Sequence, residues 1–393
     1  MSTQTLNRRS WLKQSAFAAS GVMTGISLVS EASAKPAFGM KPAYASGLVE
    51  NYHIALQDRE NMKARLLANE NPWGPSKKAI TAIAESASKG NRYVYGSTKK
   101  MVQMLAEKEG VGQENILMAA GSTDILEKTA FALCLKGGNV VSADPSYLSL
   151  VKTATSIGAT WKNIPLTPDY AHDLDAMDKA IDGDTKLVYI CNPNNPTGSL
   201  TPTDKVKAFC KSASKKVPVF VDEAYLELMD NAAANTTAGL VAEGYDIIVC
   251  RTFSKIHGMA GLRVGYMVAR PERIEMIRKL VRTEMGMCVT SLEGAMASLQ
   301  DVAFQNYTRQ HNKEGREYVF AELKKAGMDP IPSYTSFILF PIQMPVKEML
   351  DKMLLKGVGI RGYEINGRPY ARVSIGTMDE LKLFTKTLHD IVS

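Results

Sequence analysis

The sequence is poor in the residues that build disulfide frameworks and metal sites. Its 393 residues include only five cysteines, at positions 134, 191, 210, 250 and 288, and none has CxxC or metal-ligand spacing. An odd, scattered set of cysteines argues against a disulfide framework. Cys191 and Cys250 lie in apolar runs typical of strands, where a thiol packs as a small core residue. We therefore expect no metal site.

Other absences narrow the class of protein further. No basic stripe interleaved with aromatic residues is present and the formal net charge is only +7, so nucleic acid is not an expected partner. There are no internal repeats and no low-complexity linker. A hydrophobic content of 45% with 22% charged residues is typical of a soluble globular protein, and the length suffices for two domains.

The first 34 residues have the pattern of an export signal. Arg8 and Arg9 form a twin-arginine pair, a mildly apolar stretch covers 16–29, and Ala32-Ser33-Ala34 offers a small-x-small cleavage site. The arginine pair indicates the twin-arginine (Tat) route. The apolar stretch is too short and too rich in Ser and Gly to span a bilayer stably. We expect the Tat translocon as a partner during export and a periplasmic location; the alternative is a basic amphipathic N-terminus on a cytoplasmic protein.

Beyond residue 75, short apolar runs alternate with helical stretches. The runs cover 139–142, 186–191, 217–221, 246–250 and 264–269. This alternation is typical of βαβ units around a mostly parallel sheet. A long helical stretch (292–325) then leads to further strand signals at 337–340 and 371–375. We predict an α/β fold with an arm over 35–74, a large domain over 75–290 and a smaller α+β domain over 291–393.

Polar segments follow four of the apolar runs. They are Asp144-Pro145-Ser146-Tyr147, Asn192 to Gly198, Asp222-Glu223-Ala224-Tyr225 and Ser254-Lys255. In an open α/β sheet, ligands bind in the crevice beyond the carboxyl ends of the strands. We therefore expect these four segments to line one site.

Lys255 stands just past an apolar run and eight residues before Arg263. A lysine in this place suits an amine that forms an imine with an aldehyde, while Ser254 and Arg263 are placed to hold a phosphate nearby. An aldehyde and a phosphate on one small molecule describe pyridoxal 5′-phosphate (PLP). Ser122 and Thr123, after Gly121, open a helix whose free backbone N–H groups suit the same phosphate.

The other strand-end residues fit PLP chemistry as well. Asp222 would pair with the pyridine nitrogen and keep it protonated, so that the ring acts as an electron sink. Asn195 and Tyr225 would donate hydrogen bonds to the ring phenolate oxygen, and Tyr147 would stack on the ring face. Arg372 suits a bidentate grip on an α-carboxylate. Each residue alone also fits a cap, a turn, core packing or a surface position, but the joint set favours catalysis.

Taken together, these segments resemble a known family. Ala68-Asn69-Glu70-Asn71-Pro72, Asn195-Pro196-Thr197-Gly198, Asp222 to Tyr225, Ser254-Lys255 with Gly261-Leu262-Arg263, and Arg372-Val373-Ser374 look like fold-type-I aminotransferases of class I/II, and most like the histidinol-phosphate aminotransferase group. The resemblance runs from about residue 65 to the C-terminus. It implies catalysis by Lys255, Asp222 and Tyr225, and it implies a small-molecule amino donor with a 2-oxo acid acceptor.

The resemblance also implies a homodimer with active sites at the subunit interface. It implies that Tyr93 reaches the phosphate in the partner's site, that Arg361 contacts the distal group of the substrate, and that Asn71 belongs to the substrate site. The chain departs from the family at two places: Val94-Tyr95 stands where Pro-Asp is frequent, and Ser336 where Asn is usual. These departures lie near the substrate, so they bear on which substrate is used.

Two other functions fit parts of the pattern. A PLP-dependent lyase or decarboxylase of the same fold would use the same cofactor residues, because the bond that breaks depends on its alignment to the ring. An exported, non-catalytic binding protein would keep the fold alone, but Lys255 and Asp222 are both present. The expectation is therefore an aminotransferase.

Overall fold

The computed structural model describes residues 48–49, 62–93, 95–281 and 286–392. All of them belong to one compact unit, Ala43–Ser393. The predicted signal over 1–34 and most of the predicted arm lie outside the described residues.

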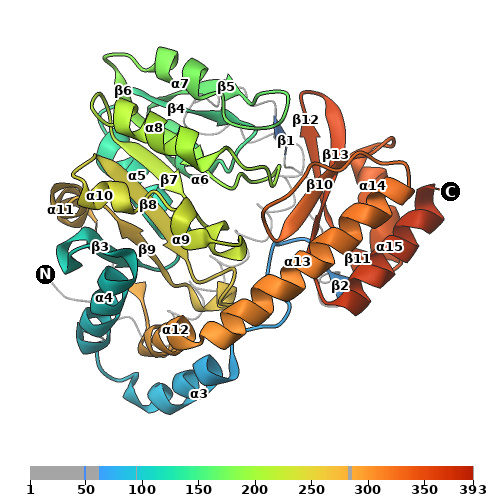
Figure 1. The fold of residues 1–393 in the computed structure, drawn as a ribbon, viewed down its shortest axis with the longest axis horizontal. Helices are drawn as coiled ribbons and strands as arrows, with labels where there is room; N and C mark the ends of the chain where they lie inside the picture. Colours follow the sequence, from blue (N-terminus) through green and yellow to red (C-terminus); the bar gives the residue numbers. More distant parts are fainter. Residues whose placement is uncertain (1–47, 50–61, 94, 282–285, 393) are drawn as a thin grey trace, which may run out of the picture. The chain divides into compact units, whose positions relative to one another are not determined.

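A seven-stranded sheet forms the centre of the large part of the molecule (Figure 1). Its strand order is β3-β9-β8-β7-β6-β4-β5. The strands are β3 (Ile116–Ala119), β4 (Asn139–Asp144), β5 (Thr160–Pro165), β6 (Thr185–Cys191), β7 (Val219–Asp222), β8 (Ile247–Thr252) and β9 (Gly265–Val268). β9 runs antiparallel to both its neighbours, and the other pairs are parallel. The predicted α/β fold with a mostly parallel sheet is confirmed.

Helices cover both faces of this sheet, because its strands are apolar on consecutive positions and must be buried on both sides. One face packs against α4 (Tyr95–Glu109), α7 (Leu174–Ala180), α8 (Thr203–Ala213), α10 (Gly239–Ala242) and α12 (Val289–Gln300). The other face packs against α5 (Ser122–Cys134), α6 (Ser149–Ser156) and α11 (Pro271–Leu280). α3 (Lys77–Ser86) packs on α12, and α9 (Ala232–Asn235) lies near the short turn Leu226–Leu228.

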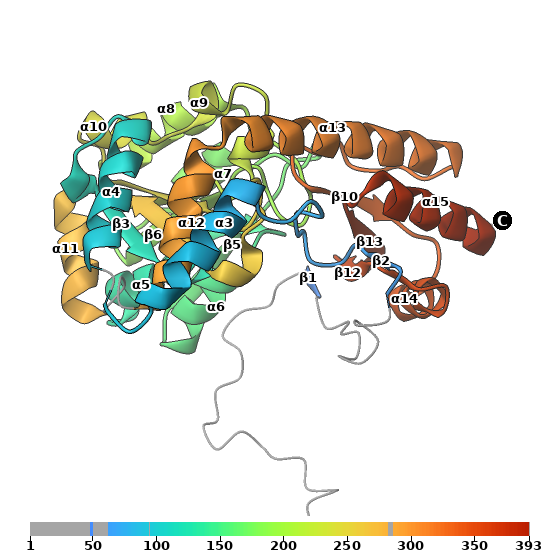
Figure 2. The same ribbon diagram turned by 90° about the horizontal axis from the view of Figure 1, so that it is seen from below.

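The smaller part is a four-stranded antiparallel sheet with helices on one face. Its order is β1 (Leu48–Val49), β12 (Arg361–Ile365), β13 (Arg368–Ser374) and β10 (Phe337–Pro341). α13 (Val302–Lys325), α14 (Val346–Leu355) and α15 (Met378–Val392) share its core. β11 (Val358–Gly359) pairs in parallel with β2 (Ala64–Arg65), which brings the segment after residue 65 beside this sheet. Figure 2 shows α13 running along the molecule toward α14 and α15.

The helical stretch predicted over 292–325 is two helices rather than one. The break lies at Asp301, whose φ of −88° and ψ of 66° are not helical and whose side chain caps α13 by accepting a hydrogen bond from the Phe304 N–H. An aspartate favours such N-cap positions because its carboxylate satisfies a free backbone donor. α12 therefore packs with α3 and α4 on the large sheet, while α13 continues to the small one.

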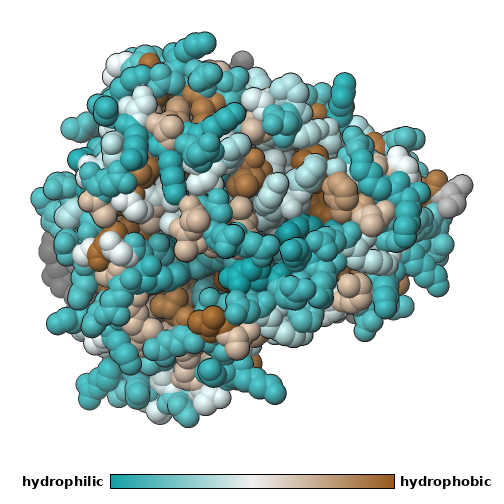
Figure 3. All heavy atoms as spheres, viewed as in Figure 1, coloured by the Kyte–Doolittle hydropathy of each residue, from teal (hydrophilic) through white to brown (hydrophobic). Residues whose placement is uncertain are grey.

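The exposed surface mixes polar and apolar side chains (Figure 3). None of the helices within 48–49, 62–93, 95–281 and 286–392 has the length and apolar character needed to cross a membrane. Over the same ranges, no group of three or more His, Cys, Asp or Glu side chains is arranged to hold a metal ion.

Candidate active site

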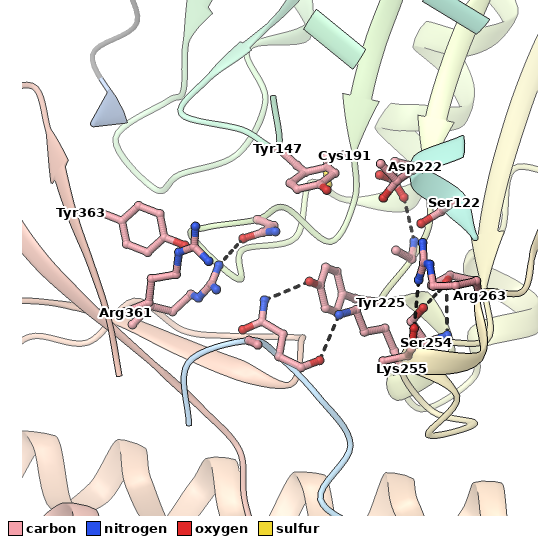
Figure 4. Close-up of a pocket in the computed structure, with 18 residues that line it drawn as sticks. Ser122, Tyr147, Cys191, Asp222, Tyr225, Ser254, Lys255, Arg263, Arg361 and Tyr363 are labelled. Atoms are coloured by element: carbon pink, nitrogen blue, oxygen red, sulfur yellow. Dashed lines mark hydrogen bonds between the residues drawn. The ribbon is translucent and has the colours of Figure 1, made fainter. Parts of the chain in front are cut away.

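A cavity of about 350 Å³ opens at the carboxyl ends of the parallel strands (Figure 4). The large sheet contributes loops after β3, β4, β6, β7 and β8, and the small sheet contributes β12 and β13. Eleven of the residues predicted from the sequence line it: Ser122, Thr123, Tyr147, Asn195, Asp222, Tyr225, Ser254, Lys255, Arg263, Arg361 and Arg372. Segments far apart in the chain thus meet at one edge of the sheet.

Lys255 reaches the cavity from the loop after β8. Its Nζ donates a hydrogen bond to the Asn69 carbonyl at 3.0 Å and lies 5.3 Å from the centre of the Tyr225 ring. Burial, and after it the Arg372 guanidinium, lowers the pKa of Lys255 to about 8. Because the charged form is disfavoured, a substantial neutral fraction is available near neutral pH, as a nucleophilic amine requires.

Asp222 ends β7 and is only 3% exposed. One carboxylate oxygen accepts a hydrogen bond from the Ala224 N–H at 3.1 Å, and the other accepts one from the Tyr189 hydroxyl at 3.3 Å. Burial raises the pKa of Asp222 to about 6. Among the described residues no cation forms an ion pair with it. This buried carboxyl group is therefore suited to a cationic partner on a ligand.

The start of α5 and Arg263 form one end of the cavity. Figure 4 shows Ser122, Ser254 and Arg263 grouped there, next to Lys255. Gly121 has φ of +90°, and a Cβ on it would lie 2.2 Å from Arg263 Nη2. A Cβ on Gly265 would lie 2.6 Å from Gly121 C and 2.7 Å from Ser122 N. The two glycines thus let a guanidinium approach a helix N-terminus closely, which is an arrangement that binds phosphate.

Arg361 and Tyr363 lie at the other end, toward the small sheet (Figure 4), and Arg372 stands opposite Arg361 on the adjacent strand β13. Arg372 is 4% exposed, and its Nη1 donates to Asn195 Oδ1 at 2.6 Å. Its guanidinium stacks against Phe337 and Tyr363, at 4.8 and 5.2 Å from the ring centres. The Nε atoms of both arginines are buried without a hydrogen-bond partner. Unsatisfied buried donors are costly, so this end is suited to an anionic group of a ligand.

Asn69 and Tyr363 also line the cavity, although the sequence indicated no role for either. Asn69 is 3% exposed; its Nδ2 donates to the Tyr225 hydroxyl at 3.0 Å, and its carbonyl accepts from Lys255. The signal for Asn69 was its place in the family-like segment 68–72. Tyr363 follows Arg361 by two positions on β12, which puts both on one strand face.

Two predicted site residues lie outside the cavity. Asn71 Nδ2 donates to the carbonyls of Lys255 and Ile256, at 3.2 and 3.0 Å, so its side chain supports the lysine loop from behind. Tyr93 is 77% exposed and packs near Tyr95, with ring centres 6.1 Å apart. It does not reach the cavity of its own chain, and its predicted place is in a partner subunit.

The residues present fit PLP. The cavity volume lies within the range of small-molecule sites. Lys255 provides an amine, Asp222 a buried carboxyl group for a ring nitrogen, and the Gly121–Ser122 turn with Arg263 a cradle for a phosphate. Tyr147 lies along the same wall as Asp222 (Figure 4), where it can contact a ring face.

Comparison with known proteins agrees with this fit. The profile of the family "Aminotransferase class I and II" matches residues 61–388. Histidinol-phosphate aminotransferases of Moorella thermoacetica and Desulfotalea psychrophila are 35% and 36% identical, over 84% and 83% of this chain and 85% and 86% of their own. The crystal structure of histidinol-phosphate aminotransferase from Sinorhizobium meliloti in complex with pyridoxal-5′-phosphate superposes with a TM-score of 0.80 at 25% identity, covering 87% of this chain and 95% of that one.

Proposed function

We propose, from the premise that this chain belongs to the class I and II aminotransferase family and is a fold-type-I, PLP-dependent aminotransferase, that it transfers the amino group of a donor with an anionic or polar distal end to a 2-oxo acid. One observation carries the substrate proposal: two arginines with unsatisfied buried Nε atoms, Arg372 and Arg361, line the end of the cavity away from Arg263. Histidinol-phosphate-like amines and acidic amino acids carry such a distal group.

In the proposed reaction, each side chain that lines the cavity has a separate role. Bound PLP supplies an aldehyde that captures amines and a ring that withdraws electrons from the substrate Cα. Lys255 Nζ would take the proton from the substrate Cα and hold it for return, for which a pKa of about 8 is suitable. Asp222 would keep the ring nitrogen of bound PLP protonated. Asn195 and Tyr225, which follow β6 and β7 and line the same cavity, would donate hydrogen bonds to the ring oxygen.

The two arginines have different tasks in this proposal. Arg372 binds the α-carboxylate, because it is buried and fixed between Asn195 and two aromatic rings. Arg361, which is less buried, binds the distal group of the donor. Arg372→Ala should harm every amino-acid donor alike, whereas Arg361→Ala should harm mainly donors with an anionic or polar distal end.

A donor panel that includes histidinol phosphate, acidic, aromatic and aliphatic amino acids tests this division of labour. Each donor is paired with a 2-oxo acid, and kcat/KM is measured for wild type and both variants. Identical losses across the panel in both variants would refute the proposal. Formation of the amino acid from the oxo acid, measured in the same reactions, separates transamination from a lyase or decarboxylase, which would release ammonia or carbon dioxide without aminating the acceptor.

The proposed assembly is a homodimer in which Tyr93 completes the partner's site. Tyr93 and Tyr95, whose ring centres lie 6.1 Å apart, are exposed to 77% and 71%. Large apolar groups exposed together are typical of an interface between protein chains. A dimer would bury these side chains and bring the Tyr93 hydroxyl toward the phosphate end of the second cavity.

The proposed location is the periplasm, reached by the Tat route. The support is the order of Arg8-Arg9, the apolar stretch and Ala32-Ser33-Ala34, and Tat carries folded proteins, so PLP can be loaded before export. Cleavage after Ala34 leaves every residue of the cavity intact. In cell fractionation the wild type should start at Lys35 in the periplasm, and an Arg8→Lys, Arg9→Lys variant should stay inside at full length. Unprocessed wild type in the cytoplasm would contradict export.

A further inference from the structure

Tyr189 lies directly behind Asp222, outside the cavity. It belongs to β6, which pairs in parallel with β7 so that Tyr189 stands opposite Phe220 and Cys191 opposite Asp222. The Tyr189 side chain is completely buried, at 0% exposure, on the sheet face that carries α5 and α6. Its hydroxyl donates a hydrogen bond to Asp222 Oδ2 at 3.3 Å.

Core packing alone does not explain this hydroxyl. The ring of Tyr189 packs against Phe220, with centres 5.8 Å apart, and a phenylalanine would keep that contact. A buried hydroxyl is costly unless it is hydrogen-bonded. Burial raises the pKa of the Tyr189 phenol well above its ordinary value, so the group stays protonated and remains a donor at working pH. The hydroxyl is therefore explained by the polar groups that it meets, which are the Asp222 carboxylate and the Cys191 thiol.

The surroundings of Asp222 show why a donor is needed there. Each carboxylate oxygen has one donor: the Ala224 N–H bonds Oδ1, and Tyr189 bonds Oδ2. The Glu223 side chain points to the opposite sheet face, where its carboxylate accepts a hydrogen bond from Arg251 Nε at 2.9 Å. The negative charge of Glu223 lies close enough to Asp222 to disfavour the ionised form of Asp222. Lys255 is the cation that favours the ionised form of Asp222 from the cavity side, but its charge is itself disfavoured by burial.

We propose that Tyr189 is a positioning residue that acts through Asp222: its hydroxyl keeps the carboxylate ionised and oriented, so that Asp222 retains the proton on the ring nitrogen of PLP. The inference rests on the proposed role of Asp222. Loss of the hydroxyl leaves Oδ2 without a donor in a buried site, and a carboxylate that has lost a donor binds a proton more tightly. A proton shared with the ring nitrogen of bound PLP would then move toward Asp222, and the ring would withdraw electrons less strongly.

The chain offers a matched control in Tyr266. This tyrosine is 2% exposed on β9, and its hydroxyl donates to Glu109 Oε1 at 2.7 Å. Glu109 is outside the cavity lining. Tyr189→Phe and Tyr266→Phe therefore each remove a phenol-to-carboxylate hydrogen bond, but only the first touches Asp222. Tyr266→Phe also removes the acceptor of a hydrogen bond from Lys108 Nζ at 3.3 Å, so it is the more disruptive change of the two.

The experiment loads wild type, Tyr189→Phe, Tyr266→Phe and Asp222→Asn with ring-15N-labelled PLP and reads the nitrogen chemical shift by NMR. PLP dissociation constants, kcat and KM are measured in parallel, and melting of the apo-proteins checks folding. We expect Tyr189→Phe to move the nitrogen signal toward the unprotonated position, to weaken PLP binding about tenfold, and to lower kcat more than KM. Tyr266→Phe should keep the wild-type signal even if it melts earlier.

The outcomes separate this inference from the role of Asp222. A changed signal in Asp222→Asn with a wild-type signal in Tyr189→Phe overturns the role of Tyr189 alone. An unchanged signal in both variants overturns the role of Asp222 and with it the inference. Equal changes in Tyr189→Phe and Tyr266→Phe show a general effect of lost core hydrogen bonds and also overturn it.

Discussion

At the scale of single residues, burial shifts the pKa values of Lys255 and Asp222 toward each other. It lowers the pKa of Lys255 to about 8 and raises that of Asp222 to about 6. In both groups, removal of water disfavours the charged form. In the proposed mechanism, a protonated ring nitrogen would offset that cost at Asp222, and the aldehyde of PLP would use the neutral amine of Lys255. The two shifts thus match the two parts of PLP to which these residues are assigned.

The role of Asp222 predicts a loss of turnover without loss of the cofactor. Asp222→Ala should still hold PLP through Lys255 and the phosphate cradle, but turnover should fall by several orders of magnitude because the ring loses its proton. The measurements are the PLP content by absorbance and kcat with the best donor. Turnover within about tenfold of wild type, or roughly 1.4 kcal/mol in barrier, would rule out this role.

The lowered pKa of Lys255 predicts the pH dependence of cofactor capture. Below the pKa the amine is protonated and cannot attack an aldehyde; above it the amine is neutral, so the rate of PLP capture by apo-protein should rise with pH and have its midpoint at about 8. Arg372 is the second cause of the lowering, so Arg372→Ala should move the midpoint upward. Stopped-flow absorbance gives the profile, and a midpoint near the ordinary lysine value of 10.5 would contradict it.

At the scale of elements, the parallel register brings the functional loops together. Cys191 on β6 stands opposite Asp222 on β7, and Asp222 stands opposite Cys250 on β8. Because these strands end at one edge, the segments that follow them meet there. The close approach of β9 to the start of α5 then sets the place of the phosphate cradle, since Gly265 lies against Gly121 and Ser122.

This contact predicts opposite outcomes for two glycines on either side of Arg263. Gly265→Ala would put a Cβ within 2.7 Å of the Ser122 nitrogen, where backbone must move, whereas a Cβ on Gly261 meets nothing within 4 Å. Gly265→Ala should therefore weaken PLP binding markedly, and Gly261→Ala should leave it unchanged. Equilibrium dissociation constants for PLP provide the measurement; equal affinities for the two variants would show that the cradle does not depend on this contact.

Most strands that are buried on both faces were predicted from the sequence, but β3, whose four residues are all buried, was not. β4, β6, β7, β8 and β9 are nearly continuous apolar runs, and each was expected within a few residues. β5 at the sheet edge has a single buried residue, Trp161, and contains Lys162 and Asn163. β12 contains Arg361 and Glu364, so neither strand showed such a run. Asp301 breaks a helix that periodicity alone would continue.

The same limit applies to the site. The rule that ligands bind beyond strand ends indicated the residues on the large sheet, because the signal there is local. This rule does not indicate Asn69, because Asn69 is not at the end of a strand of the large sheet. Its side chain donates a hydrogen bond to Tyr225, 156 positions away in the sequence, and the pairing of β2 with β11 positions the segment that contains it. Long-range pairing of two-residue strands leaves no periodic signal. Asn71 illustrates the converse: it belongs to a recognisable segment, but its side chain supports the Lys255 loop rather than the cavity.

At the scale of the whole molecule, a single chain brings all the predicted site residues into the cavity except two. Asn71 lies behind the Lys255 loop, and Tyr93 lies on the surface. The hydrogen bond from Arg372 to Asn195 joins the small sheet to the large one within the chain. Tyr93 remains on the surface, 77% exposed. A shared site in a symmetric dimer would give Tyr93 a function, because a two-fold axis places the same surface of each subunit against the other.

A shared site predicts complementation between two impaired variants. Lys255→Ala and Tyr93→Ala should each be poorly active alone, but hybrids made by mixing and reassembling them should regain activity, because one cavity then has both residues. Tyr307→Ala, which removes another exposed tyrosine (46%) on α13, is the control and should not complement Lys255→Ala beyond its own activity. Activity in the mixture equal to the sum of the two separate variants would exclude sharing.

The covalent attachment of PLP to Lys255, on which the proposed mechanism depends, can be measured directly. Holoenzyme is reduced with borohydride, digested, and analysed by peptide mass spectrometry. We expect a pyridoxyl group on Lys255, within the peptide that contains Ser254 and Ile256, and no label there in a Lys255→Arg variant. A label on any other lysine, or no label after reconstitution with PLP, would contradict the account.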